Sequence, residues 1–422
     1  MMGSSAVDLA VRRRRALGPT YHAFYREPVH LVRGEGVWLF DADGNRFLDG
    51  YNNVASVGHC HPHVVAALAR QASLLNTHTR YLSELIVEYA ERLLATCPPA
   101  LGHALFTCTG SEANDLAVRI ACHATGGVGV IVTRTAYHGA TLATAAISPS
   151  AGGSSVVTRG NRVIPAPDTY RRGGADAREF AGNLRAAIDE MSREGIKPAA
   201  LMFDTAFSSD GIFFPPAAVL RDAAAVIRAA GGLFIADEVQ AGFGRLGSAM
   251  WGFQRAGLEP DIVTLGKPMG DGHPIGAAMV RPELVADFGT ETGYFNTFGG
   301  NPVSAAVGMA VLDVMERENL IDNANRVGGY LRDGLGALAR RHALIGDVRG
   351  AGLCIGVELP AGSAASMVVN GLRQRRVLIS SCGPGGNVLK IRPPLPFSRD
   401  NADQLLDALD ETLSDPSLHA ET

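Results

Sequence analysis

Lysine is scarce in this sequence of 422 residues: among 38 lysines and arginines, only Lys197, Lys267 and Lys390 are lysines. The formal net charge is −4, so no overall positive field would attract nucleic acid or anionic lipid. The six cysteines include no C-x-x-C pair, which favours reduced thiols over a disulfide framework or a zinc site, and we expect no metal. No G-x-G-x-x-G motif joins a predicted strand to a clear helix, which argues against a nicotinamide cofactor.

Long apolar runs are also missing. No stretch approaches the roughly 20 apolar residues needed to span a bilayer. The N-terminus lacks the apolar core of a signal peptide. These absences predict a cytoplasmic protein without membrane or nucleic-acid partners. The basic run Arg12–Arg15 is expected to be a solvated helix face, with partner binding or targeting as the alternative.

The composition, 46% hydrophobic and 19% charged, is typical of a globular enzyme, and the length allows two or three domains. From residue 101 to about 280, β-rich runs alternate with helical ones. This alternation predicts an α/β fold with a largely parallel sheet between helices. The predicted strands are 103–107, 128–133, 200–204, 232–236, 262–265 and 276–280, and the predicted helices are 112–124, 176–194 and 216–230.

The two ends of the chain are predicted to lie outside this sheet. A hairpin turning at Asp43-Gly44 is expected near the N-terminus. The C-terminal part is predicted to contain long helices in 301–340, strands at 352–358, 376–379 and 388–391, and a helix at 400–413. We therefore expect an N-terminal segment (1–55) packing with a small α+β domain (311–422), and a large domain (56–310).

One predicted strand ends abruptly in an acid. Residues 231–236 are glycine and apolar residues, and Asp237 follows them directly. In open α/β sheets ligands lie at the carboxyl ends of strands, so Asp237 emerges where a ligand would bind. A lone acid in this position more often caps the next turn. Val239 and Gln240 favour the functional alternative, because they can touch the face and the hydroxyl of a flat ring.

Lys267 repeats this pattern thirty residues later, since an apolar strand and a glycine precede it and a proline follows. A lysine inside a site can lose its charge and become a nucleophile, whereas the alternative is a surface turn. Together, Lys267 and Asp237 match the needs of pyridoxal phosphate. The amine holds the aldehyde as an imine, and the acid keeps the pyridine nitrogen protonated.

A phosphate site is predicted where Thr109-Gly110-Ser111 follow one strand and begin a helix. Free amides and the positive end of the helix dipole attract an anion there, although an ordinary helix cap is the alternative. Tyr137, after the next strand, can stack on an aromatic cofactor or pack as a loop aromatic. Thr297 precedes another helix and offers a second hydroxyl and amide to a phosphate.

These motifs together resemble the class III aminotransferase family. The matching segments are TGSEAN (109–114), YHG (137–139), DEVQAGFGR (237–245), LGKPMG (265–270) and NTFGGNP (296–302), and the likeness extends over residues 20–415. The resemblance implies the pyridoxal-phosphate fold type I. It therefore implies a mostly parallel seven-stranded sheet between helices in the large domain, and a smaller α+β domain.

The resemblance also implies roles for individual residues. Asp237 and Lys267 would be the catalytic pair, at the pyridine nitrogen and as the Schiff-base lysine. Thr297 would reach the phosphate of the neighbouring subunit, which implies a homodimer with shared sites. The remaining cofactor contacts implied are Gly110 and Ser111 to the phosphate, Tyr137 and Val239 to the ring faces, and Gln240 to the ring hydroxyl.

Finer motifs look like one branch of this family, which contains ethanolamine-phosphate and phosphohydroxylysine phospho-lyases. They are residues 52–62, 167–170, 266–274 and 345–350. This likeness implies elimination of phosphate from a 2-aminoethyl phosphate, giving an aldehyde, ammonia and phosphate. An amine:2-oxo-acid aminotransferase using the same cofactor residues is the alternative.

The substrate contacts are predicted from fewer signals. Arg80 and Arg392 are candidates to hold the leaving phosphate, and in an aminotransferase Arg392 would bind a carboxylate. Asp204 stands where the family usually has Glu, and Asp271 stands where the branch tends to have Asn. The shorter Asp204 is expected to change the geometry of substrate binding.

Overall fold

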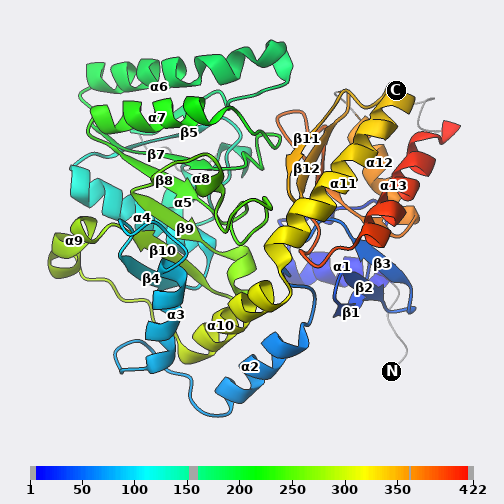
Figure 1. Ribbon diagram of the computed structural model, residues 1–422, viewed down its shortest axis with the longest axis horizontal. Coiled ribbons are helices and arrows are strands. Elements are labelled where there is room, and N and C mark those ends of the chain that lie inside the picture. The colour runs from blue at the N-terminus through cyan, green and yellow to red at the C-terminus, as the bar shows by residue number, and fades with distance from the viewer. Residues whose placement is uncertain (1–5, 152–159, 361–362, 417–422) are drawn as a thin grey trace.

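The computed structural model describes residues 6–151, 160–360 and 363–416, and within them seven strands form one large sheet (Figure 1). Their order is β4-β10-β9-β8-β7-β5-β6, with β10 antiparallel to both neighbours and the other pairs parallel. The mostly parallel seven-stranded sheet is therefore confirmed. The strands are β4 (His103–Thr107), β5 (Gly129–Thr133), β6 (Arg162–Ile164), β7 (Pro198–Asp204), β8 (Leu233–Asp237), β9 (Ile262–Leu265) and β10 (Gly276–Val280).

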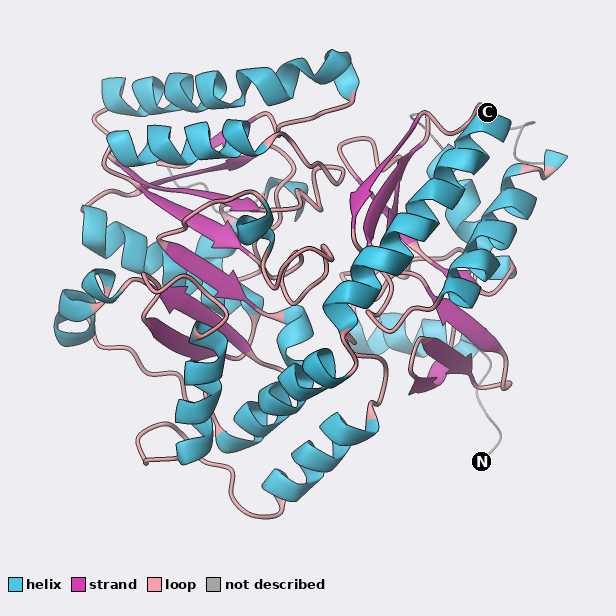
Figure 2. Ribbon diagram, in the orientation of Figure 1, coloured by secondary structure: helices cyan, strands magenta, loops and turns pink. Residues whose placement is uncertain are grey.

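Both faces of this sheet are buried. Along β7, Leu201 and Phe203 join an apolar cluster that includes side chains of α6 (Ala175–Arg193) and α7 (Ala217–Ala229). The alternating residues Ala200 and Met202 join a second cluster, with side chains of α4 (Gly110–Thr125). Because successive side chains point to opposite faces of a strand, α4 covers one face and α6 and α7 cover the other (Figure 2).

Each predicted helical region is helical in the structure. The predicted helices at 112–124, 176–194 and 216–230 correspond to α4, α6 and α7. The helical region 301–340 is divided at Asn319, whose φ of +50° ends one helix and starts the next. The other helices are α1 (Ala6–Leu17), α2 (Pro62–Ala72), α3 (Glu84–Leu94), α5 (Leu142–Ala145), α8 (Gly252–Arg255), α9 (Ala286–Glu291), α10 (Pro302–Arg317), α11 (Leu320–Arg341), α12 (Ala364–Gln374) and α13 (Arg399–Leu413).

The smaller part of the fold combines both ends of the chain. The predicted hairpin is β2 and β3, in which Trp38 pairs with Leu48, and β3 pairs in parallel with β13. Two four-stranded sheets result, in the orders β1-β2-β3-β13 and β11-β12-β15-β14. The strands are β1 (Leu31–Glu35), β2 (Trp38–Asp41), β3 (Arg46–Asp49), β11 (Asp347–Ala351), β12 (Cys354–Glu358), β13 (Val377–Leu378), β14 (Ser380–Cys382) and β15 (Val388–Ile391).

The pairing of β3 with β13 attaches the N-terminal segment to the C-terminal part of the chain. The division at residues 55 and 310 stays a prediction, and α10 extends across the second of these positions. Among the helices that the structure describes, none is long and apolar enough to cross a membrane.

Candidate active site

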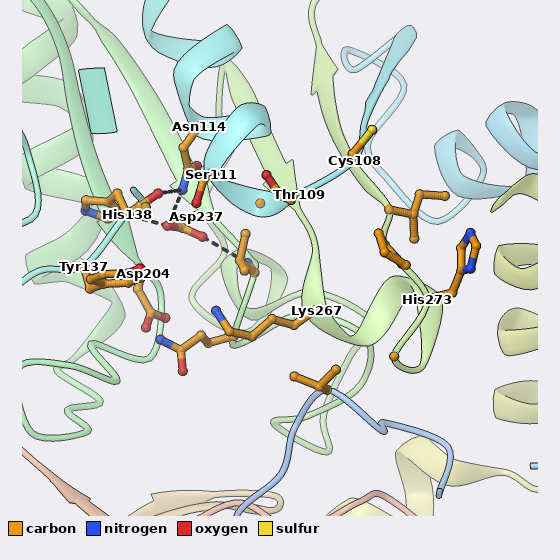
Figure 3. Close-up of a pocket in the computed structure, with 18 residues that line it drawn as sticks. Cys108, Thr109, Ser111, Asn114, Tyr137, His138, Asp204, Asp237, Lys267 and His273 are labelled. Atoms are coloured by element: carbon orange, nitrogen blue, oxygen red, sulfur yellow. Dashed lines mark hydrogen bonds and ion pairs between the residues drawn. The ribbon is translucent and has the colours of Figure 1, made fainter. Parts of the chain in front are cut away.

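A cavity of about 340 Å³ lies at the carboxyl ends of β7, β8 and β9, beside the start of α4. The structure brings eight of the predicted site residues together in its lining, with their side chains gathered around one space (Figure 3). They are Gly110, Ser111, Tyr137, Asp204, Asp237, Val239, Gln240 and Lys267. The cavity is where an open α/β sheet binds its ligands.

Asp237 is held in one orientation by three polar partners. Asn114 Nδ2 donates to its Oδ2 at 2.9 Å, and His138 Nδ1 lies 2.7 Å from the same oxygen. The backbone amide of Val239 donates to Oδ1 at 3.0 Å. Thr264 in turn donates to Asn114 Oδ1, so the amide of Asn114 is also fixed. The carboxylate is thus buried, oriented and directed into the cavity.

Glu238, the second acid of the motif, has a different role. Its side chain is fully buried and accepts hydrogen bonds from Thr205 Oγ1 and from the amides of Gly252 and Phe253. These two amides begin α8, so Glu238 caps that helix. Burial raises the pKa of Glu238 to about 7. The alternation of side chains therefore leaves Asp237 as the acid of this pair that faces the cavity.

Lys267 begins a short 3₁₀ turn directly after β9. Burial, and secondarily the charge of Arg392, lower the pKa of its ammonium group, while Asp237 and Asp204 act in the opposite direction. A lower pKa increases the share of neutral amine, which is the nucleophilic form. Lys267 and Asp237 extend into the same cavity (Figure 3).

The start of α4 has both a helix cap and a free anion-binding end. Thr109 Oγ1 accepts from the amide of Glu112, and Glu112 accepts from the amide of Thr109 in a capping box. The amides of Gly110 and Ser111 lie in the first turn, where a helix offers no partner of its own. A Cβ atom on Gly110 would lie 2.9 Å from the Val239 side chain. Glycine therefore lets the helix end approach the ring position.

Three of the predicted residues, Arg80, Thr297 and Arg392, do not line this cavity. Arg80 is exposed, and its guanidinium lies 4.1 Å from the ring centre of Phe295. Thr297 is also exposed, in the same loop as Phe295. The roles of Arg80 and Thr297 stay predictions, and neither residue touches the site of its own chain.

Arg392 lies one side chain behind the cavity wall. Its guanidinium donates to Gln240 Oε1 and lies 4.7 Å from the ring centre of Tyr51. Gln240 lines the cavity, so Arg392 is connected to the site through this side chain. The backbone amide of Arg392 is bound to the carbonyl of Gly50, which fixes the position of its Cα atom.

Sequence reasoning assigned no function to Asn114, His138 or Lys390. The first two lie in the recognised motifs, yet their contacts with Asp237 join positions 123 and 99 residues apart. Lys390 is buried, and its Nζ donates to the carbonyl of Ser208 at 2.8 Å. Burial, then the charge of Arg392, lower the pKa of Lys390 to about 8. The available signal was the alternation Lys390-x-Arg392, which an extended backbone would place on one face, although Arg392 lies directly after the end of β15.

Comparisons with known proteins agree with this geometry. Residues 21–413 match the family model described as aminotransferase class-III. A solved phospholyase from Arthrobacter, in complex with phosphoethanolamine, is 44% identical with a TM-score of 0.93, covering 97% of this chain and 100% of that one.

Two further relatives carry different names. An alanine–glyoxylate aminotransferase 2-like protein of Drosophila melanogaster is 40% identical over 95% of this chain and 86% of its own length. The ethanolamine-phosphate phospho-lyase homolog 1 of Caenorhabditis elegans is 36% identical over 97% of this chain and 94% of its own. Relatives of both reaction types therefore cover nearly the whole chain.

Proposed function

Because this chain belongs to the class III aminotransferase family, which uses pyridoxal phosphate, we propose that it is a phospho-lyase acting on a 2-aminoethyl phosphate such as ethanolamine phosphate. The products would be an aldehyde, ammonia and inorganic phosphate. The observation that carries the proposal is a pair of buried cations, Lys390 and Arg392. Arg392 donates to Gln240, which lines the cavity, and Lys390 donates to the carbonyl of Ser208, in the turn that follows the cavity-lining Asp204.

These two cations lack a negative partner. Lys390 and Arg392 are 6% and 5% exposed, and within the described residues neither has a carboxylate at ion-pair distance. An unpaired buried charge costs on the order of several kcal/mol, and here the two charges also repel each other. A bound anion would offset both terms. A phosphate ester with two negative charges matches two cations better than a carboxylate with one.

The relatives support the same substrate class. The Arthrobacter phospholyase, 44% identical to this chain, was solved with phosphoethanolamine, and the nematode relative is named for ethanolamine phosphate. The name of the Drosophila relative favours amino-group transfer instead. The names of the relatives thus point to both reactions. The argument from this chain itself is the pair of buried cations, Lys390 and Arg392, which favours a phosphorylated substrate.

The residues of the cavity fit the cofactor of the family. The amides of Gly110 and Ser111 would hold its phosphate, and the carboxylate of Asp237, with its three fixed donors, would hold the pyridine nitrogen. Tyr137 and Val239 would contact the ring faces and Gln240 the ring hydroxyl. When bound, the cofactor supplies an electron-accepting ring next to the substrate amine.

The chain's own groups then move the proton and hold the leaving group. Lys267 Nζ, in its neutral form, would take the proton from the carbon that bears the substrate amine. The bond between the adjacent carbon and the phosphate oxygen would break, and Lys390 and Arg392 would hold the departing phosphate. The lowered pKa of Lys267 increases the share of its neutral amine, which is the form that accepts a proton.

We also propose that the enzyme is a homodimer with shared sites. A groove of about 360 Å³, lined by α3, β4 and the loop around Phe295, presents apolar side chains such as Val87 and Leu94. Phe298, next to Thr297, is 71% exposed. A second copy would cover this apolar surface, which monomers rarely expose, and would receive Thr297 at its own phosphate site.

The decisive experiment supplies the purified holoenzyme with ethanolamine phosphate and no oxo acid. We expect inorganic phosphate and acetaldehyde to appear in equal amounts. Turnover that requires pyruvate or another oxo acid, with no phosphate released, would replace this proposal with an amine:2-oxo-acid aminotransferase.

A further inference from the structure

The turn that follows β7, residues 205–213, has an unusual backbone. Phe207 and Ile212 have φ angles of +47° and +62°, and both side chains are fully buried. The left-handed region is unfavourable for bulky residues, and for a β-branched residue such as isoleucine it is a clear outlier. Surrounding contacts must therefore impose this conformation.

The large domain holds the turn at two points. The carboxylate of Asp204 accepts hydrogen bonds from the amides of Ala206 and Ser208, each at 2.9 Å. Further along, the buried Asp210 accepts from the hydroxyls of Thr133 and Thr135, at 2.7 and 2.5 Å. The turn is thereby attached to the ends of β5 and β7.

The small domain holds the other side of the turn. Arg349 of β11 donates from Nε to the carbonyl of Ile212 at 2.9 Å, and from its second terminal nitrogen to the carbonyl of Gly211 at 2.7 Å. Lys390 donates to the carbonyl of Ser208 at 2.8 Å. The two domains thus meet at a strained turn whose neighbour in sequence, Asp204, lines the cavity.

Arg349 is itself fixed by acids of its own domain. Its terminal nitrogens donate to Asp347 at 2.9 Å and to the buried Glu358 at 2.6 Å. Glu358 also binds Arg171, for which no hydrogen bond or ion pair with the turn is present among the described residues. Asp347 and Glu358 therefore fix the orientation of the Arg349 guanidinium independently of its bonds to the turn.

We propose that Arg349 is a positioning residue for the substrate: by holding the carbonyls of Gly211 and Ile212, it sets the Asp204 carboxylate and the Lys390 ammonium on opposite sides of one rigid turn. The substrate class, a phosphorylated amine, rests on the proposed function. Asp204 lines the cavity and Lys390 is bonded to the same turn, so a shift of this turn would change the space and the charge that the phosphate end of the substrate meets.

The test compares two matched variants of the holoenzyme, Arg349→Lys and Arg171→Lys. Both keep the positive charge and both remove a guanidinium that binds Glu358. Lysine at 349 cannot reach Glu358, Asp347 and both turn carbonyls together, because it has one nitrogen. We expect R349K to raise KM for ethanolamine phosphate, and the Kd for inorganic phosphate, by at least about fivefold, roughly the loss of one well-placed hydrogen bond. Its kcat and its cofactor absorbance should change little.

R171K should lose thermal stability without such a change in KM. Equal KM values for R349K and wild type, or equal increases in both variants, would show that Arg349 only stabilises the fold and would overturn the inference. A wild-type enzyme that releases no phosphate, and does not bind ethanolamine phosphate, would overturn the proposed function and with it the inference. Failure of the inference alone leaves phosphate release by the wild type intact.

Discussion

Asp271 lies in the loop that follows Lys267, with a φ of +48°. Its Oδ1 accepts a hydrogen bond from the amide of Val57 at 2.9 Å, which joins this loop to the segment above the cavity. Burial raises its pKa to about 8, and the hydrogen bond from Val57 acts in the opposite direction. At neutral pH the folded protein therefore holds a proton here that an unfolded chain, with a pKa of about 3.9, would release.

This proton predicts how stability depends on pH. Because the folded pKa is raised, the contribution of Asp271 is most favourable below about pH 4 and is lost as pH rises to about 8. Asn accepts the same hydrogen bond, tolerates a positive φ and does not ionise. We expect Asp271→Asn to increase the free energy of unfolding at pH 8 by a few kcal/mol, at about 1.4 kcal/mol per unit of pKa shift.

Urea unfolding of wild type and D271N at pH 5 and pH 8 measures this effect. Asp333→Asn, at an exposed position of α11, is the matched control and should follow the wild type. Parallel pH dependences for D271N and wild type would mean that Asp271 is ionised in the folded protein.

At the scale of elements, β15 and the residue that directly follows it carry two buried cations, Lys390 and Arg392. Lys390 lies in β15 between buried apolar residues, and Arg392 follows the strand directly. An apolar side chain of similar length would pack in the same place without a charge to desolvate. The strand thus has a cation where stability alone would favour a methionine, as expected for a binding residue.

We therefore expect Lys390→Met to separate function from stability. The KM for ethanolamine phosphate should rise about tenfold or more, corresponding to loss of a charge-assisted hydrogen bond. The melting temperature should change little, because removing the buried charge offsets the lost hydrogen bond to the carbonyl of Ser208. Lys197→Met, at an exposed lysine, is the control and should change neither quantity. A large fall in melting temperature with an unchanged KM would assign Lys390 a structural role.

At the scale of the whole molecule, the apolar groove between α3 and the Phe295 loop predicts that two copies of this chain associate. Val87, at 52% exposure, lines this groove, and a charge there would oppose burial against a second copy. We expect wild type to have twice the chain mass of 44.3 kDa in solution, and Val87→Asp to shift towards the monomer with loss of activity. Light scattering after size exclusion measures both.

Val128→Asp is the matched control, because Val128 is 64% exposed and does not line the groove. A monomeric wild type with full activity would contradict the proposal of shared sites. It would also leave Thr297 without a phosphate to bind.

Local sequence patterns were sufficient to predict most strands of the large sheet and the two central site residues, Asp237 and Lys267. Asp237 and Lys267 were predicted because each follows a short apolar run, and the edge at which parallel strands end collects such residues. The strand β6 was missed because its three residues, one of them Arg162, have too little apolar signal. The boundaries of β8 differ from the prediction by one residue, which makes Asp237 the last residue of the strand.

The supporting contacts could not be predicted in this way, because they join residues far apart in the chain. Arg349 and the carbonyl of Gly211 are 138 residues apart, and Lys390 and the carbonyl of Ser208 are 182 apart. No local pattern encodes such a pair, since each contact depends on how distant parts of the chain pack together. Short motifs in the sequence identify the reactive residues of the site. The orientation of Asp237 and the environment of Lys390 depend on contacts between residues that are far apart in the sequence.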